Sequence, residues 1–224
     1  MTKKFALIVA GGSGSRMNNN LLKQFLELAG KPVLMHTFDA FFRFDPNMEF
    51  ILVLPEKEQK TWSELCRTFS FNIEHRVANG GATRFESVKN GLQLISEEGI
   101  VFIHDGVRPL VSLQTLTNCL QSAEIHGNAL PVIPVSESVR YIDNSGNRSL
   151  DRSKYFLVQT PQTFRTAIIK AAYRQTFSDI FTDDASVLEN TGQAIFTVEG
   201  NRENIKITYP EDLEFAEVLM QTKM

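Results

Sequence analysis

The sequence has few residues of the kinds that make metal centres, disulfides or nucleic-acid surfaces. Its 224 residues include two cysteines, four histidines and one tryptophan, and the formal net charge is -3. Cys66 and Cys119 form no C-x-x-C pair, so a zinc or redox motif is unsupported and we expect buried, reduced thiols. The nearly balanced charge argues against wholesale nucleic-acid or membrane-surface binding, although it leaves room for a local basic pocket.

Long hydrophobic runs are also lacking. The first apolar run covers only residues 5–10, which is too short for a signal-peptide core or a membrane span. We therefore expect a cytoplasmic location, with no membrane partner and no nucleic-acid partner. The hydrophobic share of 42% and the charged share of 22% are those of an ordinary globular protein. The length suits a single domain, which we place at residues 1–224.

What the sequence does contain is an alternation of short apolar runs and helical patterns. The apolar runs predict strands at 5–10, 50–54, 100–104 and 129–135. The first and third are almost continuously apolar, as expected for parallel strands covered on both faces. The alternation predicts an α/β fold with a doubly wound, mostly parallel sheet and right-handed crossovers.

Capping residues predict where the intervening helices begin and end. Thr83 and Glu86 make a T-x-x-E capping box, and Ser112 and Gly127 suit the start and end of the next helix. After the first box, four apolar residues share one helix face. They are Phe85, Val88, Leu92 and Ile95.

The alternation fails after about residue 135. Strand-like runs at 138–142 and 155–159 flank an Asn-Ser-Gly-Asn turn, and we interpret residues 136–159 as a β-arm that leaves the core. An ordinary surface hairpin is the alternative. The chain then returns with a helix near 165–177, a strand within 194–200 and a helix from Pro210.

A glycine-rich turn follows the first predicted strand, in the stretch "LIVAGGSGSRM". Glycines at such a place let backbone N–H groups approach an anion closely. The Walker A pattern fails here, and the dinucleotide fingerprint started at Gly12 finds Met17 instead of glycine. A glycine loop followed by Arg16 and Lys23 suits a nucleoside triphosphate that is held and attacked. A plain β-turn is the alternative interpretation of the glycines alone.

Six blocks occur in order over nearly the whole chain: "AGGSGSRM…KQFLELAGKPVL", "GGATRFESVKNGL", "VFIHDGVRPLV", "LDRSKYFLVQTPQTF", "TDDASVLE" and "ENIKITYPEDL". In these blocks the chain closely resembles the 2-C-methyl-D-erythritol 4-phosphate cytidylyltransferase family of the non-mevalonate isoprenoid pathway. The resemblance implies a Rossmann-like nucleotidyltransferase fold and a homodimer formed through the arm. It also implies a divalent metal, usually Mg²⁺, and cytidylyl transfer from CTP to the polyol phosphate with release of pyrophosphate.

The resemblance also assigns candidate residues around CTP. Arg16 and Lys23 would be catalytic, offsetting the charge that grows at the reacting phosphorus. Asp105 would hold the metal or ribose hydroxyls, although an aspartate that ends a strand is often only a cap. The residues implied for CTP binding are Ala10, Gly11, Gly12, Ser13, Gly14, Gly80, Gly81, Ala82, Ser87, Asp105 and Gly106.

A second set matches the family's acceptor pocket. Arg152 and Lys206 would take the acceptor phosphate, and Arg152, which lies in the arm, would reach the partner subunit's site. For both, a surface charge is the alternative. The residues implied for acceptor binding are Arg108, Arg152, Thr160, Thr182, Asp183 and Lys206.

The chain also departs from the family pattern. Leu22 stands where the family usually has proline, and Gly106 in "HDGVRP" replaces an alanine and is expected to loosen the turn beside Asp105. These changes approach ribitol-5-phosphate cytidylyltransferase, which is our alternative. A nucleotide-sugar pyrophosphorylase and a noncatalytic CTP-binding module are more distant alternatives.

Overall fold

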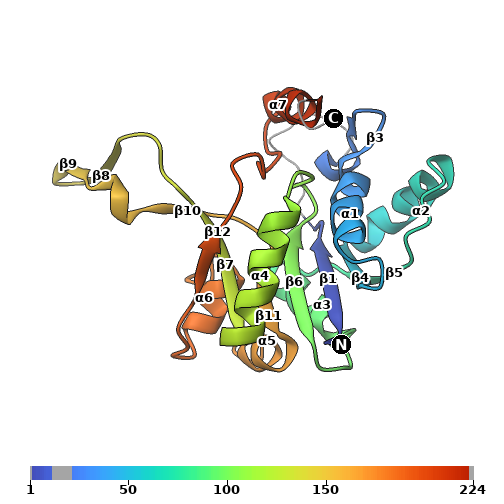
Figure 1. Ribbon diagram of the computed structural model, residues 1–224, viewed down its shortest axis with the longest axis horizontal. Coiled ribbons are helices and arrows are strands. Elements are labelled where there is room, and N and C mark those ends of the chain that lie inside the picture. Colours follow the sequence, from blue (N-terminus) through green and yellow to red (C-terminus); the bar gives the residue numbers. More distant parts are fainter. Residues whose placement is uncertain (1, 12–21, 222–224) are drawn as a thin grey trace.

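One twisted sheet runs through the centre of the computed structural model, which describes residues 2–11 and 22–221 (Figure 1). The strands lie in the order β10-β7-β11-β6-β1-β4-β5, and β12 pairs with β7 outside this path. Their bounds are β1 (Lys4–Val9), β4 (Glu49–Leu54), β5 (His75–Asn79), β6 (Ile100–Asp105), β7 (Asn128–Pro134), β10 (Phe156–Val158), β11 (Gln162–Arg165) and β12 (Thr197–Glu199).

The predicted parallel core is present, and one strand interrupts it. Strands β6, β1, β4 and β5 pair in parallel, whereas β11 is antiparallel to both of its neighbours, β6 and β7. The sheet is therefore mostly parallel, as the sequence predicts. Because β11 runs the opposite way, its first residues lie at the edge where β1 and β6 end.

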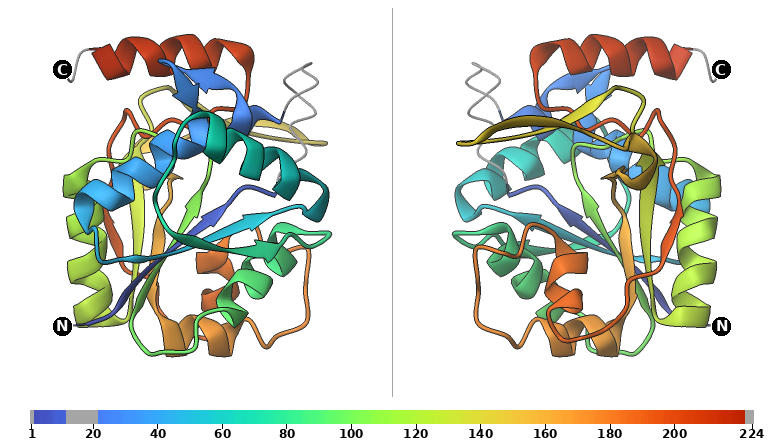
Figure 2. Two further views of the ribbon diagram at one scale, coloured as in Figure 1. Left: turned by 90° about the vertical axis from the view of Figure 1, so that its right-hand side faces the viewer. Right: turned by 90° about the vertical axis from the view of Figure 1, so that its left-hand side faces the viewer.

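Helices cover both faces of the sheet. Side chains alternate along β1, so that Ala6 and Ile8 belong to one buried cluster and Phe5 and Leu7 to another. Figure 2 shows α1 and α2 on one side of the sheet and α3, α5 and α6 on the other. The helices are α1 (Val33–Phe44), α2 (Gln59–Thr68), α3 (Arg84–Gln93), α4 (Leu113–His126), α5 (Thr166–Ala172), α6 (Asp184–Glu189) and α7 (Pro210–Gln221).

Short elements complete the fold. Within the described residues, three 3₁₀ turns and two small ladders connect the larger elements. They are η2 (Lys23–Phe25), η3 (Glu56–Glu58), η4 (Arg152–Lys154), β2 (Glu27–Leu28) paired with β3 (Lys31–Pro32), and β8 (Val139–Asp143) paired with β9 (Gly146–Leu150). Within residues 2–11 and 22–221 no helix has the length and apolar character of a membrane span.

The predicted helix caps are confirmed. The Thr83 hydroxyl accepts from the Glu86 N–H at 3.1 Å, and the Glu86 carboxylate accepts from the Thr83 N–H at 3.0 Å. Ser112 caps α4, which ends at Gly127 with φ 91°. The apolar face predicted for α3 is buried throughout. Local sequence therefore fixes where α3 begins, directly behind the loop that carries Gly81.

Both strand-like runs predicted between 136 and 159 are strands, but they pair with different partners. We expected strands at 138–142 and 155–159 around the turn, but β8 pairs with β9, and the two project from the body (Figure 1). Residues 156–158 instead form β10, which is antiparallel to β7 in the main sheet. The predicted helix at 165–177 is also shorter, because α5 ends at Ala172.

Candidate active site

The carboxyl ends of β1 and β6 border a cavity of about 420 Å³. Ligands of open α/β sheets bind at such an edge. The cavity is lined by the loop after β1, the η2 turn and the loop before α3. Of the predicted residues, it contains Ala10, Gly11, Lys23, Gly81, Ala82, Ser87, Asp105 and Lys206. The predicted Gly12, Ser13, Gly14 and Arg16 lie outside the described residues.

The loop before α3 presents backbone to this cavity. A Cβ at Gly81 would lie 2.3 Å from the Cβ of Glu86, so only glycine fits there. The Ser87 hydroxyl accepts from the Gly81 N–H at 3.0 Å and donates to the Thr83 carbonyl at 2.9 Å. The loop is thus shaped before any ligand arrives, and one lone pair of the Ser87 oxygen is left to accept a further hydrogen bond.

Two predicted glycines do not line the cavity. The Gly80 N–H donates to the Leu54 carbonyl at 3.0 Å and continues the ladder beyond β4. At Gly106 the turn is held rather than loosened: its N–H donates to Val9 and its carbonyl accepts from Thr37. A Cβ at Gly106 would lie 3.1 Å from the Cβ of Ala10, so glycine lets this turn pack tightly behind the cavity wall.

Lys23 reaches the cavity from a turn that is tied to β1. The next residue, Gln24, is buried, and its side-chain amide donates to the Ala10 carbonyl at 2.7 Å. This bond joins the η2 turn to the end of the first strand. Sequence reasoning did not single out Gln24, since no motif marks it.

A second cavity of about 310 Å³ adjoins the first. The segment before β11 contributes Thr160, whose hydroxyl oxygen accepts from the Asp105 N–H at 3.1 Å. Gln162 donates to the Asp183 carboxylate at 2.8 Å, which places the start of α6 against the start of β11. This cavity contains five predicted acceptor residues: Arg108, Thr160, Thr182, Asp183 and Lys206.

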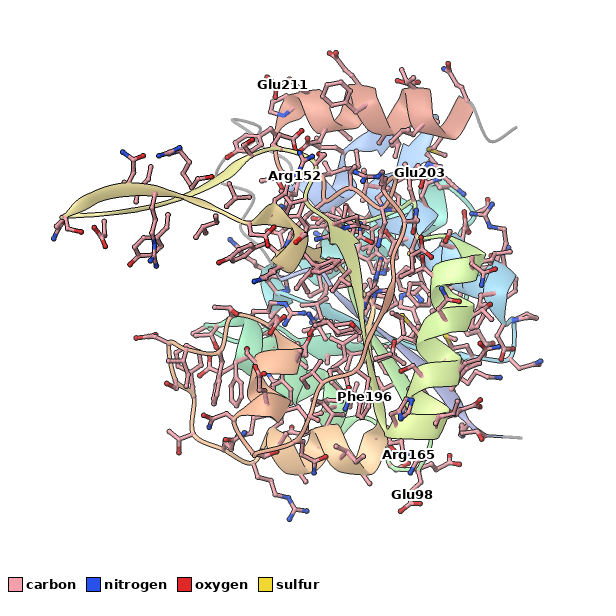
Figure 3. The ribbon with its side chains drawn as sticks, turned by 60° about the vertical axis from the view of Figure 1, so that its left-hand side comes forward. Glu98, Arg152, Arg165, Phe196, Glu203 and Glu211 are labelled. Atoms are coloured by element: carbon pink, nitrogen blue, oxygen red, sulfur yellow. The ribbon has the colours of Figure 1, made fainter. Side chains whose placement is uncertain are left out.

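Arg152 lines neither cavity. It belongs to η4, at the place where the arm leaves the body (Figure 3), and one guanidinium nitrogen donates to the Ser136 carbonyl. Its side chain is exposed. Within this subunit, therefore, Arg152 is separate from the other predicted acceptor residues.

The two cavities share one charged wall, made by Arg84, Asp105 and Lys206. The Asp105 Oδ2 atom lies 3.0 Å from the Lys206 Nζ and 3.2 Å from the Arg108 Nε, and its Oδ1 lies 3.9 Å from the Arg84 Nε. Burial opposes ionisation of this carboxyl, but Lys206, Arg84 and Arg108 together hold its pKa well below the usual range. Asp105 is thus an anion surrounded by three cations.

His104 supports this wall from the core. Burial lowers its pKa to about 4, so the ring is neutral at neutral pH. Its Nε2–H donates to the Arg108 carbonyl at 3.0 Å, and Nδ1 accepts from the Thr160 hydroxyl at 3.1 Å. The histidine connects the end of β6 to the segment that leads into β11, and its place is structural.

Arg84 and Asp184 were missed by the sequence analysis. They form a two-bond ion pair, although 100 positions separate them in the chain. One signal was available: Arg84 occupies the first turn of α3, where the helix dipole disfavours a cation. A cation at such a position indicates a compensating anion or a ligand.

The described residues of the charged wall offer few side-chain ligands for a divalent metal. Among residues 2–11 and 22–221 no group of three histidine, cysteine, aspartate or glutamate side chains is placed to hold a metal ion. Of the described residues, Asp105 is the one carboxylate common to both cavities, and its Oδ1 has fewer close partners than its Oδ2. One carboxylate suits Mg²⁺ where substrate phosphates and water supply the remaining ligands.

Comparisons with known proteins agree on one family. The family model described as IspD: 2-C-methyl-D-erythritol 4-phosphate cytidylyltransferase matches residues 5–222. The enzyme of that name from Bacteroides fragilis is 54% identical and covers 96% of this chain and 98% of its own, and that from Bacteroides thetaiotaomicron is 50% identical, covering 97% and 100%.

Solved structures show the same relationship. The 4-diphosphocytidyl-2C-methyl-D-erythritol synthase of Anaerococcus prevotii has a TM-score of 0.83 at 27% identity, covering 98% of this chain and 99% of its own. The 2-C-methyl-D-erythritol 4-phosphate cytidylyltransferase of Thermus thermophilus has a TM-score of 0.80 at 31% identity, covering 98% and 99%. This chain therefore belongs to the 2-C-methyl-D-erythritol 4-phosphate cytidylyltransferase (IspD) family.

Proposed function

We propose that the protein transfers the cytidylyl group of CTP to 2-C-methyl-D-erythritol 4-phosphate, giving 4-diphosphocytidyl-2-C-methyl-D-erythritol and pyrophosphate for isoprenoid precursor synthesis. The observation that carries this proposal is the pair of cavities with one common charged wall. A nucleotide in the larger cavity and a phosphorylated polyol in the smaller one would meet at Lys206.

In this reaction an oxygen of the acceptor phosphate attacks the α-phosphorus of CTP. The bond from that phosphorus to the bridging oxygen breaks, and pyrophosphate leaves with the electron pair. Both reactants are polyanions, so positioning and charge neutralisation are the main demands on the protein. Lys23 supplies positive charge on the nucleotide side, and Lys206 supplies it on the acceptor side. The family resemblance gives Arg16 the same role as Lys23.

The base would be read by neutral groups of the loop before α3. The Ser87 oxygen has a free lone pair, and the backbone around Gly81 and Ala82 faces the cavity. An amino group, which cytosine carries and uracil lacks, can donate to such an oxygen. This arrangement supports CTP over UTP.

Mg²⁺ fits this site when it is held by Asp105 and by the triphosphate of the substrate. Once bound, it would neutralise phosphate charge and polarise the phosphorus under attack. On the acceptor side, Thr160, Thr182 and Asp183 present hydroxyl and carboxylate oxygens suited to hydroxyls of the polyol.

We further propose a homodimer formed through the arm. Large apolar side chains on β10 are exposed, with Phe156 at 51% and Leu157 at 55%. Burying them against a second copy would remove them from water. In such a dimer Arg152 would reach the partner subunit's acceptor cavity.

The direct test measures pyrophosphate release from CTP, Mg²⁺ and each of two acceptors. We expect turnover with 2-C-methyl-D-erythritol 4-phosphate, little turnover with ribitol 5-phosphate, and slow reaction when UTP replaces CTP. Turnover with ribitol 5-phosphate alone would favour the alternative acceptor. Calorimetric binding of CTP without turnover of either acceptor would indicate a noncatalytic module.

The role of Arg152 is tested by mixing two inactive variants. Arg152→Ala and Lys23→Ala chains, refolded together, form mixed dimers in which one site has Lys23 from one chain and Arg152 from the other. We expect activity to return in the mixture. If mixed dimers form and remain inactive, Arg152 acts within its own subunit or not at all.

A further inference from the structure

The guanidinium of Arg84 is held in a fixed orientation from behind the wall. Its two terminal nitrogens donate to the two carboxylate oxygens of Asp184 at 2.9 and 2.6 Å. The Tyr173 hydroxyl donates to the same carboxylate at 2.5 Å. Asp184 has no exposed surface and Tyr173 is 2% exposed. Because Asp184 occupies both terminal nitrogens of Arg84, only the Nε side of the arginine faces Asp105.

The other cation at the shared wall is held differently. Lys206 is a flexible side chain, 45% exposed, with one ion pair to Asp105. If the acceptor phosphate binds beside it, this ammonium can turn to the phosphate at little cost. Arg84 cannot follow, because moving it would leave the buried Asp184 carboxylate without its partner.

We propose that Arg84, fixed by Asp184 and Tyr173, is a positioning residue that holds Asp105 in place when Lys206 turns to the acceptor phosphate. This inference rests on the proposed function. Arg108 assists from the acceptor side, since its terminal nitrogen is tied to the Asn204 carbonyl at 2.7 Å. Arg84, unlike Arg108, lines both cavities and faces the other oxygen of Asp105.

Stability alone does not explain why α3 and α6 are joined by a buried ion pair. A buried pair often stabilises no better than apolar side chains of similar size, because both charges must be desolvated. The surroundings are already apolar, with the Phe85 and Tyr173 rings stacked at 4.7 Å. An apolar pair could therefore join the helices, but it would leave the wall without its fixed cation.

A double variant that removes the Arg84–Asp184 ion pair separates an effect on folding from an effect on the position of Asp105. The double variant Arg84→Met with Asp184→Leu removes both charges together and should stay folded, with a melting temperature lower by several degrees because the buried Tyr173 hydroxyl loses its acceptor. We expect kcat to fall about 30-fold, a loss typical of one electrostatic contact, with the KM for CTP changed less than threefold. The matched control Lys4→Met with Asp45→Leu removes a pair joined at 2.7 Å at the other end of the sheet and should keep the parental kcat.

A folded double variant with the parental kcat would overturn the proposal. Should that variant fail to fold, Arg84→Lys decides, because it keeps the charge and loses the two-bond fork. A kcat about tenfold lower at unchanged KM for CTP is the expected result, and the parental kcat would again overturn the proposal.

A crystal of the parental protein soaked in inorganic phosphate tests whether Arg84 stays in place when Lys206 moves. This experiment involves no turnover, so its outcome does not depend on the proposed function. We expect phosphate in the smaller cavity, Lys206 turned from Asp105 to the phosphate, and Arg84 still bonded to Asp184. Phosphate bound there with Arg84 released from Asp184, or with Lys206 still on Asp105, would contradict the proposal.

Discussion

The two ends of the central sheet carry charge in opposite ways. At the carboxyl end three cations share the buried Asp105. At the amino end lies a larger cavity, of about 900 Å³, where Lys3 pairs with Glu49 and Glu97, and Lys4 pairs with Asp45. Figure 3 shows Arg165 and Glu98 near this end, away from the arm.

The difference shows that cavity size does not identify the active site. At the amino end most acidic and basic groups are paired with one another at partly exposed positions, so the field there is locally balanced. At the carboxyl end Arg84, Arg108 and Lys206 outnumber the two carboxylates that they contact, Asp105 and Asp184, which leaves positive potential for a phosphate. The excess of cations is therefore found at the two smaller cavities, to which we assign the reaction.

Among substitutions at the two ends of the sheet, we expect the largest loss of kcat at Lys23. Lys23→Ala removes a cation from the nucleotide cavity and should lower kcat by about two orders of magnitude or more, as losses of a transition-state donor do. Steady-state pyrophosphate release measures it. An unchanged rate would remove Lys23 from the mechanism.

Asp105→Asn should separate binding from turnover. It leaves three cations without their shared anion, so inorganic pyrophosphate, tested by calorimetry without metal, should bind about fivefold more tightly. Turnover should fall about 50-fold, because the group that organises the wall is lost. Weaker pyrophosphate binding would show that the carboxylate does not restrain the cations as described.

His104 should make stability at the carboxyl end depend on pH. Its folded pKa of about 4 lies below the ordinary value of 6.5, so between these values the unfolded chain binds the proton and the folded chain does not. Stability is then complete above pH 6.5 and is lost as the pH falls toward 4. Between about pH 7.5 and about pH 5 this histidine should cost about 2 kcal/mol of unfolding free energy.

Denaturant titrations of the parental protein and of His104→Asn at both pH values measure this contribution. The variant is expected to be less stable at neutral pH but to lose less on acidification. Asp105, whose pKa is also lowered, contributes only at lower pH and does not confuse the comparison. Equal acid losses in both proteins would assign the effect to other groups.

The smallest effect is expected at the amino end. Lys4→Met breaks one partly exposed ion pair with Asp45 and should lower the unfolding free energy by about 1 kcal/mol, with kcat unchanged. Thermal melts and the pyrophosphate assay measure the two quantities. A tenfold loss of kcat here would break the contrast between the two ends of the sheet.

Much of the fold follows from local signals in the sequence. Continuous apolar runs predict β1, β4, β6 and β7, and hydroxyl and glycine caps predict the limits of α3 and α4. The strands β5, "HRVAN", and β11, "QTFR", are short and partly polar, and no such signal marks them. They form strands because their backbones hydrogen-bond to a neighbouring strand, and this neighbour is in place only in the folded chain. The same holds for the pairing of β8 with β9 rather than with residues 155–159.

The site shows a similar division. The family resemblance assigned Gly81 and Asp105 to CTP, and both line the 420 Å³ cavity at the carboxyl end of the sheet. Motifs did not indicate Asp184, because its partner lies 100 positions away and its neighbour Asp183 is the more obvious helix cap. A buried anion becomes apparent only when the fold brings the arginine to it.

The reversed direction of β11 determines which part of the chain lines each cavity at the carboxyl end of the sheet. This strand brings residues 158–162 to the edge where β6 ends. The 310 Å³ cavity is therefore lined mostly by residues 158–206, whereas the 420 Å³ cavity is lined mostly by residues 9–107. In the proposed function, the nucleotide and acceptor cavities are therefore built mostly from different halves of the chain. New acceptors could evolve by rewriting the second half, with the machinery for activating CTP inherited unchanged.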